Sequence, residues 1–390
     1  MQQLPKRLLS IDVLRAVTMF LMIFVNEVSG VKNIPLWIEH TPGNVDGMGF
    51  ADTIFPAFLF IVGLSLPFAI NNKLKKGESF LQILTYILSR SAAMLIMGFF
   101  HVNLEEYNSA LAVLPRALWA IIVTVSFFLI WLDYPESTSV RQKYTLIGVG
   151  IVTLIGMGLL FQGGSAADPV GMRPYWWGIL GIIGWSYLVC AVLYLVTGGK
   201  LNWLIILWVI FASINITSHL GLIGAIPIIG DGASVTLTLG GIVISRVYSS
   251  LFSQQKSGLL WVTFGLTGIL LIAAGLLIRP YTDGISKIHS TPAWVFICSG
   301  ITILVFEACI YLIDIKGKRD WFSWISPAGT STLTCYLMPY FYVYLLELVH
   351  VKYPGLINSG IIGIIRAFAL SFILITIVGR LQKKSIKLKI

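Results

Sequence analysis

Charged residues are scarce in this chain of 390 residues: Asp, Glu, Lys and Arg make up 11% of it, while hydrophobic residues make up 57%. Soluble domains carry about 25% charged residues, so the composition excludes a soluble protein and predicts a polytopic membrane protein. The apolar runs are continuous and lack the alternation of a membrane barrel. The expected fold class is therefore all-α, an integral membrane bundle of helices.

Cysteine is also rare, and none of the spacings between cysteines fits a metal or redox motif. The four cysteines are Cys190, Cys298, Cys309 and Cys335. All fall inside expected membrane spans, so we expect buried thiols and no metal site. The chain lacks a glycine-rich phosphate loop, so a nucleotide site would have to be built from helix ends and basic side chains. Its polar connections are too short to fold alone, and residues 1–390 are expected to form one domain.

We expect twelve membrane spans of about 20 residues each, of which the third is shorter than the others. They are residues 9–30, 50–71, 87–101, 112–133, 144–162, 175–197, 203–226, 232–252, 258–278, 293–314, 327–349 and 360–381. The first has a basic start like that of a signal peptide. However, Asp12 and Arg15 interrupt its apolar core and no cleavage site follows, so we expect a retained span.

An even number of spans puts both termini on one side of the membrane. Of the 27 Lys and Arg residues, 19 lie on the face that holds the termini, 7 on the other face, and Arg246 inside a span. Basic residues favour the cytoplasmic side, so we expect cytoplasmic termini in a multi-pass protein of the inner (cytoplasmic) membrane. The net charge of +10 mostly reflects this asymmetry and does not indicate nucleic-acid binding.

Histidines gather at one side of the expected bundle. All five lie at or near the non-cytoplasmic ends of spans: His40, His101, His219, His289 and His350. Imidazole is the side chain whose proton affinity suits acid–base work near neutral pH. Between the first two spans, His40 has an amide before it, Asn26, and a carboxylate after it, Asp52. This pattern predicts a polar chamber that opens outward.

Three patterns in the first 63 residues resemble one known family. They are S-I-D-x-L-R-A at Ser10 to Ala16, V-N at Val25 and Asn26, and D-G-x-x-x-A-D-x-x-F-P-x-F-x-F-I-x-G from Asp46 to Gly63. The chain resembles the heparan-alpha-glucosaminide N-acetyltransferase family, and in particular its bacterial membrane branch. Weaker matches to the family pattern follow at Asp314 to Gly317 and near Pro327.

The resemblance implies an acetyl-CoA-dependent acyltransferase. Such enzymes take acetyl groups from cytoplasmic acetyl-CoA and deliver them to a sugar amine or hydroxyl beyond the membrane. The family's functional histidine lies in the first non-cytoplasmic loop and corresponds to His40, its asparagine to Asn26, and its A-D-x-x-F-P motif to Asp52, Phe55 and Pro56.

This chain departs from the family pattern at three places. His40 lies about two residues further from Asp52 than in the animal enzymes. An extra hairpin is expected around 175–226. The turn before the tenth span reads SKIHS where the family has an asparagine-rich turn, and its His289 is a rival to His40 for the catalytic role.

Acetyl transfer needs a base for the acceptor proton and a donor for the tetrahedral oxyanion. We expect His40 to act as base or transient acetyl carrier, Asn26 to donate its amide N–H to the thioester oxygen, and Asp52 to orient the imidazole. Each residue also has a structural alternative. His40 would be a solvated loop histidine, Asn26 a helix-ending residue or interhelical link, and Asp52 a helix cap.

Two arginines are expected to meet the phosphates of CoA. Arg15 lies 11 residues before Asn26, about 16 Å along a helix, which is on the order of the length of extended pantetheine. Its alternative role is an ion pair with Asp12 on the same helix face. Arg246 lies inside the eighth span, at a depth similar to that of Glu307, so its alternative role is a salt bridge with that carboxylate.

The expected partners are therefore the lipid bilayer, acetyl-CoA and a sugar or glycan acceptor. The sequence leaves open whether the chain forms homo-oligomers, which acceptor it uses, and whether transfer is ping-pong or direct. The main alternative is a small-solute transporter or flippase that uses the same polar chamber, although no repeat relates the two halves. A third is a membrane scaffold. Several aromatic residues are expected near the outer membrane–water interface, where they would anchor the protein or stack on a sugar ring. They are Trp37, Tyr107, Tyr175, Trp176, Trp177, Tyr281 and Trp294.

Overall fold

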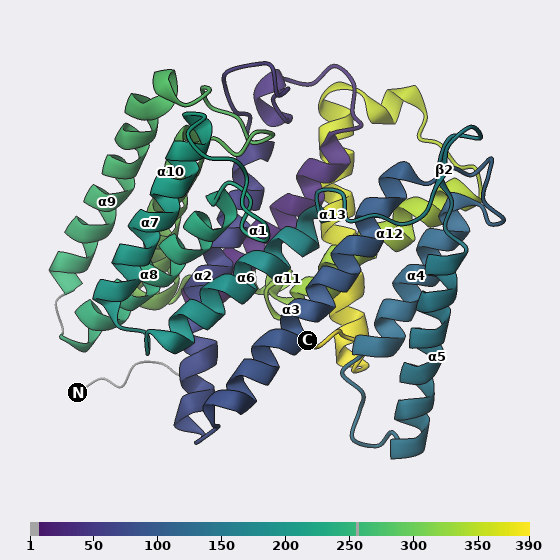
Figure 1. Cartoon of the computed structure of the whole chain (residues 1–390), viewed down its shortest axis with the longest axis horizontal. Helices are drawn as coiled ribbons and strands as arrows, with labels where there is room; N and C mark the ends of the chain where they lie inside the picture. The colour runs from purple at the N-terminus through teal and green to yellow at the C-terminus, as the bar shows by residue number, and fades with distance from the viewer. Residues whose placement is uncertain (1–7, 255–256) are drawn as a thin grey trace.

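The computed structural model describes residues 8–254 and 257–390, and within them nearly all regular structure is helical. The α-helices are α1 Leu9–Val28, α2 Ala51–Lys75, α3 Phe80–Asn103, α4 Arg116–Trp131, α5 Val140–Leu159, α6 Gly178–Val196, α7 Leu201–His219, α8 Ala233–Ser253, α9 Ser257–Ile278, α10 Pro292–Cys309, α11 Ser326–Thr330, α12 Thr332–Leu348 and α13 Gly360–Lys383 (Figure 1). Short helical turns join them at η1 Leu36–Ile38, η2 Leu104–Glu106, η3 Arg279–Tyr281, η4 Ile310–Ile315, η5 Lys318–Ile325 and η6 Gly355–Asn358. Strands β1 Gly163–Gly164 and β2 Pro169–Val170 form a small antiparallel hairpin.

Each of the twelve predicted spans coincides with a long helix, and the all-helical membrane fold is confirmed. In the described residues, ten helices are long and apolar enough to cross a bilayer. The other two are α4, with 16 residues, and α12, with 17 residues and an internal Pro339. The chain is a multi-pass membrane protein.

The predicted boundaries of the third span were wrong. Helix α3 begins at Phe80 rather than at residue 87, and it has 24 residues. The reason is a capping box: the amide of Gln82 donates to the hydroxyl of Ser79, and the amide of Ser79 donates to the side chain of Gln82. This exchange satisfies two backbone donors, so the helix begins at Phe80, one residue after Ser79.

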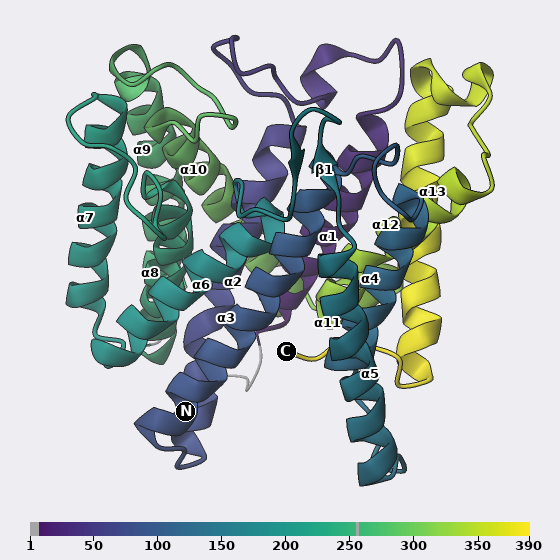
Figure 2. The ribbon, with the colours of Figure 1, turned by 45° about the vertical axis from the view of Figure 1, so that its right-hand side comes forward.

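The loop from α1 to α2 lies at the top in Figures 1 and 2, and the turn from α2 to α3 lies at the bottom. We call the end of the bundle that holds the α1–α2 loop the His40 end. Helices α5 and α9 lie at opposite sides of the bundle (Figure 1). Both expose apolar side chains along their length, such as Val152 on α5 and Leu270 on α9. A helix of this kind is suited to face hydrocarbon.

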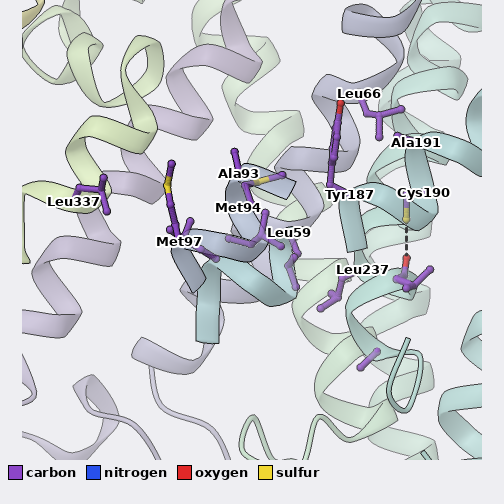
Figure 3. Packing of buried hydrophobic residues seen from close by; sticks show 14 of the residues in the cluster. Leu59, Leu66, Ala93, Met94, Met97, Tyr187, Cys190, Ala191, Leu237 and Leu337 are labelled. Carbon is purple, nitrogen blue, oxygen red and sulfur yellow. Dashed lines mark hydrogen bonds between the residues drawn. The ribbon is translucent and has the colours of Figure 1, made fainter. Parts of the chain in front are cut away.

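Glycines bring the central helices into backbone contact. A Cβ on Gly63 of α2 would lie 1.9 Å from the carbonyl oxygen of Thr238 in α8, and a Cβ on Gly241 of α8 would lie 2.0 Å from that of Phe60 in α2. No side chain fits in either place, so the two helices are fixed side by side. In Figure 3, Leu59 of α2 lies between Met97 of α3 and Leu237 of α8. The closest neighbour of α2 in this cluster is therefore α8, which its backbone touches.

Candidate functional site

The central feature of the His40 end is a bonded pair of His40 and Asp52. The Nδ1 atom of His40 lies 2.7 Å from Oδ1 of Asp52. The second carboxylate oxygen accepts hydrogen bonds from the backbone amides of Thr41 at 2.9 Å and Gly49 at 3.0 Å. The Asp52 side chain is 1% exposed, whereas that of His40 is 32% exposed. The carboxylate is therefore fixed by three donors, and the imidazole still reaches solvent.

Asp52 is not an N-terminal cap of the usual kind. Its side chain bonds to amides of the preceding loop, and Phe50, the N-cap residue of α2, makes no side-chain cap. Asp52 still lies in the first turn of α2, where the helix dipole favours a negative charge. The charge can therefore serve both the helix and the imidazole.

The loop reaches this shape because Gly49 has no side chain. A Cβ at Gly49 would lie 1.9 Å from the carbonyl oxygen of Glu39. The close approach lets the amide of Phe50 donate to the carbonyl of Trp37 at 2.7 Å. The loop therefore folds back on itself and presents His40 to the start of α2.

A second loop, residues 279–291, closes over the first. Asp46 accepts hydrogen bonds from Nε of Arg279 at 2.9 and 3.0 Å and from the amide of Ile285 at 2.7 Å. The hydrogen bond from the Ile285 amide, followed by that from Arg279, lowers the pKa of Asp46. On α10, the indole N–H of Trp294 donates to the carbonyl oxygen of Asp52 at 3.0 Å. These contacts lock the start of α10 to the start of α2.

This second loop brings Lys287 to the imidazole, which the sequence did not predict. Its Nζ lies 3.3 Å from Nδ1 and 3.4 Å from Nε2 of His40. Burial lowers the pKa of Lys287, and the nearby charge of Asp52 acts in the opposite direction. One signal was available: Lys287 belongs to the SKIHS turn, and it is one of few basic residues expected on that face.

The rival histidine, His289, lies in the same loop but does not join the pair. It is exposed, and its ring lies against Gly43, where a Cβ would be 3.2 Å from Nε2. Asn26 is exposed in the last turn of α1, and within the described chain its amide makes no hydrogen bond to His40 or Asp52. The structure thus brings together two of the three predicted catalytic residues.

Arg15 lines a cavity of about 500 Å³ that lies toward the end of the bundle opposite the His40 end. Its guanidinium donates to Asp12 at 3.2 Å, to the carbonyl oxygen of Gly329 at 3.2 Å and to the hydroxyl of Ser65. The ion pair with Asp12 is therefore present, and it holds Arg15 at the cavity wall. The wall also includes the following residues: Arg90, Lys389, Asn72, Tyr187, Tyr336, Phe58 and Val62.

The salt bridge between Arg246 and Glu307 is absent from the described residues, and that alternative was wrong. The carboxylate of Glu307 lies beside Gly265 of α9. Arg246 instead lies near enough to Tyr194 of α6 to interact electrostatically, and its Nε has no hydrogen-bond partner among the described residues. Arg246 also lies outside the lining of the 500 Å³ cavity.

The fold and the site together define a class: a polytopic helical membrane protein with a histidine–carboxylate pair at one end and a basic cavity toward the other. Residues 7–107 match the family model of heparan-alpha-glucosaminide N-acetyltransferase, catalytic. The resemblance to this family is thereby confirmed over that part of the chain. The matched stretch contains Arg15, Asn26, His40 and Asp52, but not Lys287.

Two curated relatives carry the same name. The chain is 35% identical over 100 residues to heparan-alpha-glucosaminide N-acetyltransferase of Homo sapiens, covering 26% of this chain and 14% of the relative. It is 31% identical over 146 residues to the protein of that name from Mus musculus, covering 35% of this chain and 22% of the relative. The matched stretch spans less than a quarter of either relative.

Proposed function

We propose that this protein is a membrane acetyltransferase that moves an acetyl group from cytoplasmic acetyl-CoA to an amine or hydroxyl of a sugar or glycan on the other side of the inner membrane. One observation carries the proposal. The His40–Asp52 pair lies within the family-matched stretch at one end of the bundle, and the basic cavity beside Arg15 begins toward the opposite end.

The cavity of about 500 Å³ is proposed as the donor site. Pockets for small molecules span about 300–1,000 Å³, so the cavity suits the pantetheine arm, with the nucleotide at its mouth. Arg15, Arg90 and Lys389 supply the cations that phosphates require. The cavity reaches Phe58 on α2, six residues or about 9 Å along the helix from Asp52. A phosphate role for Arg246 stays a prediction, and its position outside the cavity argues against it.

His40 is proposed to do the proton transfer or to carry the acetyl group. With Nδ1–H donating to Asp52, Nε2 keeps the lone pair that does the chemistry, and this nitrogen lies 3.4 Å from the Lys287 ammonium. In direct transfer, Nε2 takes the acceptor proton as the acceptor attacks the thioester and the CoA thiolate leaves. In the ping-pong route, Nε2 forms the bond to the acetyl carbon first, the C–S bond breaks, and the acceptor then displaces the imidazole.

Lys287 is proposed to support both routes. Its ammonium, 3.3 Å from Nδ1 and 3.4 Å from Nε2 of His40, is placed to hold the imidazole in position. It also provides a cationic donor for the oxyanion that forms as the thioester is attacked. Asn26, with its exposed amide, is proposed as a second donor that engages only when acetyl-CoA is bound.

The proposal is tested with purified protein and radiolabelled acetyl-CoA. Transfer of label to an amino sugar, or to His40 itself, supports it. Accessibility tagging must also find residue 40 on the non-cytoplasmic side, as the distribution of basic residues predicts. A transporter is the competing function, favoured by separate cavities toward the two ends of the bundle. Solute uptake that is independent of CoA would support the transporter and overturn the acetyltransferase.

A further inference from the structure

A short segment after the last helix forms part of the wall of the cavity beside Arg15. Helix α13 ends at Lys383, and residues 387–390, which we call the strap, contain no helix. Three residues of the strap line the cavity of about 500 Å³: Leu388, Lys389 and Ile390. In both ribbon views the C-terminus lies between the α2–α3 hairpin and α5 (Figures 1 and 2). The strap is therefore a wall of the cavity that is not built from a helix.

The strap is joined to the end of α4 through its backbone. Two hydrogen bonds, of 2.8 and 2.9 Å, connect it to residues 131–133, and they flank an antiparallel bridge between Leu132 and Leu388. The amide of Leu388 also donates to the hydroxyl of Thr334 on α12 at 3.0 Å. Among the described residues that line the cavity, none belongs to α4 or α5. The strap thus separates the cavity from these two helices.

One carboxylate fastens the strap by charge. Asp133, just after α4, pairs with Nζ of Lys389 at 3.2 Å and with Nζ of Lys387 at 3.4 Å. The Asp133 side chain is 27% exposed and that of Lys389 is 72% exposed. Ion pairs that reach solvent to this degree stabilise a structure little. Lys389 therefore lies at the cavity with a hold on Asp133 that a stronger anion can replace.

The strap is held less firmly than the helices around it. Its contacts comprise the buried side chain of Leu388, three hydrogen bonds of its backbone and the two ion pairs of Asp133. Segments with few buried apolar contacts open locally at a small part of the free energy of global unfolding. The strap can therefore leave the cavity while the bundle stays folded.

Phosphate groups compete with Asp133 for Lys389. An ammonium forms charge-assisted hydrogen bonds with phosphate oxygens, and CoA brings several phosphate groups against the single carboxylate of Asp133. When Lys389 turns to a phosphate, one of the two ion pairs that fasten the strap is lost. A ligand shifts a conformational equilibrium by the difference between its affinities for the two states. Here the free ammonium of Lys389 supplies that difference.

We infer that the strap is a latch on the cavity: Asp133 holds it closed in the free protein, and the phosphates of the ligand draw Lys389 away and open it. The inference rests on the proposed function in one respect, that the ligand is CoA. It adds a regulated entrance to the cavity and names Asp133, Thr334 and Leu388 as the residues that keep the entrance closed.

The first test measures opening without CoA. In Ala69→Cys the new thiol lies in the cavity wall on α2, and its rate of reaction with a water-soluble methanethiosulfonate reports access. Adding Asp133→Asn should raise this rate about 3–10-fold, the factor expected when exposed ion pairs are lost. The matched control is Glu78→Gln, which removes an ion pair at the α2–α3 turn outside the cavity lining and should leave the rate unchanged. Wild-type protein gives the background from the native cysteines.

The second test locks the latch. Leu132 and Leu388 lie directly opposite each other between two flanking hydrogen bonds, and such pairs have Cα atoms about 4.5 Å apart, a separation that a disulfide accepts. In Leu132→Cys/Leu388→Cys, oxidation should slow CoA association about 10-fold or more, and a reductant should restore it. Leu388→Cys alone, treated with the same oxidant, is the control and should show no change.

Two results would overturn the inference. Equal labelling rates in the Asp133→Asn and Glu78→Gln backgrounds would make the strap a fixed wall, and so would equal CoA association in the oxidised and reduced double-cysteine protein. Labelling does not depend on CoA, so the two proposals can fail separately. If labelling responds to Asp133→Asn as expected but wild-type protein binds no CoA, the proposed function fails and the latch stands.

Discussion

The ammonium of Lys287 lies within 3.4 Å of both ring nitrogens of His40, although the two residues are 247 positions apart in the chain. An ammonium this close can hold the ring in place and can donate a hydrogen bond to it. The contact depends on the loop before α10, which Asp46 and Arg279 tie to the loop that holds His40.

Replacing Lys287 should slow the chemical step. In Lys287→Met, we expect kcat to fall about 10²-fold, because the cationic donor for the oxyanion is lost. Lys287→Arg keeps the charge and should recover part of kcat. An unchanged kcat in Lys287→Met would leave the lysine with a structural role only.

The rate should also decline at alkaline pH, because the pKa of Lys287 is lowered. As pH rises through that lowered value, the amine loses its proton and the cation disappears. Wild-type activity should therefore decline at a pH below the ordinary pKa of a lysine. Arginine stays protonated throughout, and in Lys287→Arg the decline should move to higher pH. Rate profiles of the two proteins between neutral pH and about 11 provide the comparison.

His40→Ala should abolish transfer, and Asp52→Asn should lower kcat by about 10²–10⁴-fold because the imidazole loses its orientation. Both proteins should still bind CoA, measured by calorimetry. His289→Ala is the matched control, since His289 lies in the adjoining loop without contacting Asp52. Should His289→Ala be inactive and His40→Ala active, the site assignment would be wrong.

Arg15→Gln should weaken CoA binding by about 10–100-fold, the range for losing a hydrogen bond between charged groups. With dephospho-CoA as the ligand, the loss of affinity should be smaller only if Arg15 binds the ribose phosphate of CoA. Arg246→Gln serves as the control, because Arg246 lies outside the cavity, and its affinity should stay near wild type. The reverse result, with Arg246 carrying the effect, would relocate the donor site to the α6–α8 interface.

Gly49→Ala tests whether the loop geometry matters to function. A Cβ there would collide with the carbonyl of Glu39, so the loop must shift and the Asp52 carboxylate loses an amide donor. We expect transfer to fall at least 10-fold, and circular dichroism should show that the helices remain folded. Gly30→Ala is the control, since a Cβ at Gly30 meets nothing within 4 Å; equal losses in both would contradict this account.

The sequence predicted the helices well because a bilayer allows few alternatives: runs of about 20 apolar residues become spanning helices. It also predicted that Asp52 would orient His40, and the two do lie in contact, because a short loop and one helix start control their separation. Lys287 could not be found in this way. Its approach depends on how α10 packs against α2, and no local pattern encodes that packing.

The pairing of Arg246 with Glu307 failed for an instructive reason. Equal depth in the membrane was estimated from residue counts along two helices. Depth does not determine rotation about the helix axis, and here Arg246 faces Tyr194 of α6 while Glu307 faces α9. Two charges at one level can therefore point to different neighbours.

Phe58 lines the cavity beside Arg15, whereas its neighbours Phe55 and Leu59 on the same helix line a second cavity at the His40 end. With acetyl-CoA in the first cavity and an acceptor at the His40 end, only a two-carbon fragment has to pass α2, and neither whole substrate does. A bundle of this kind has no need to rock between inward-open and outward-open shapes during turnover.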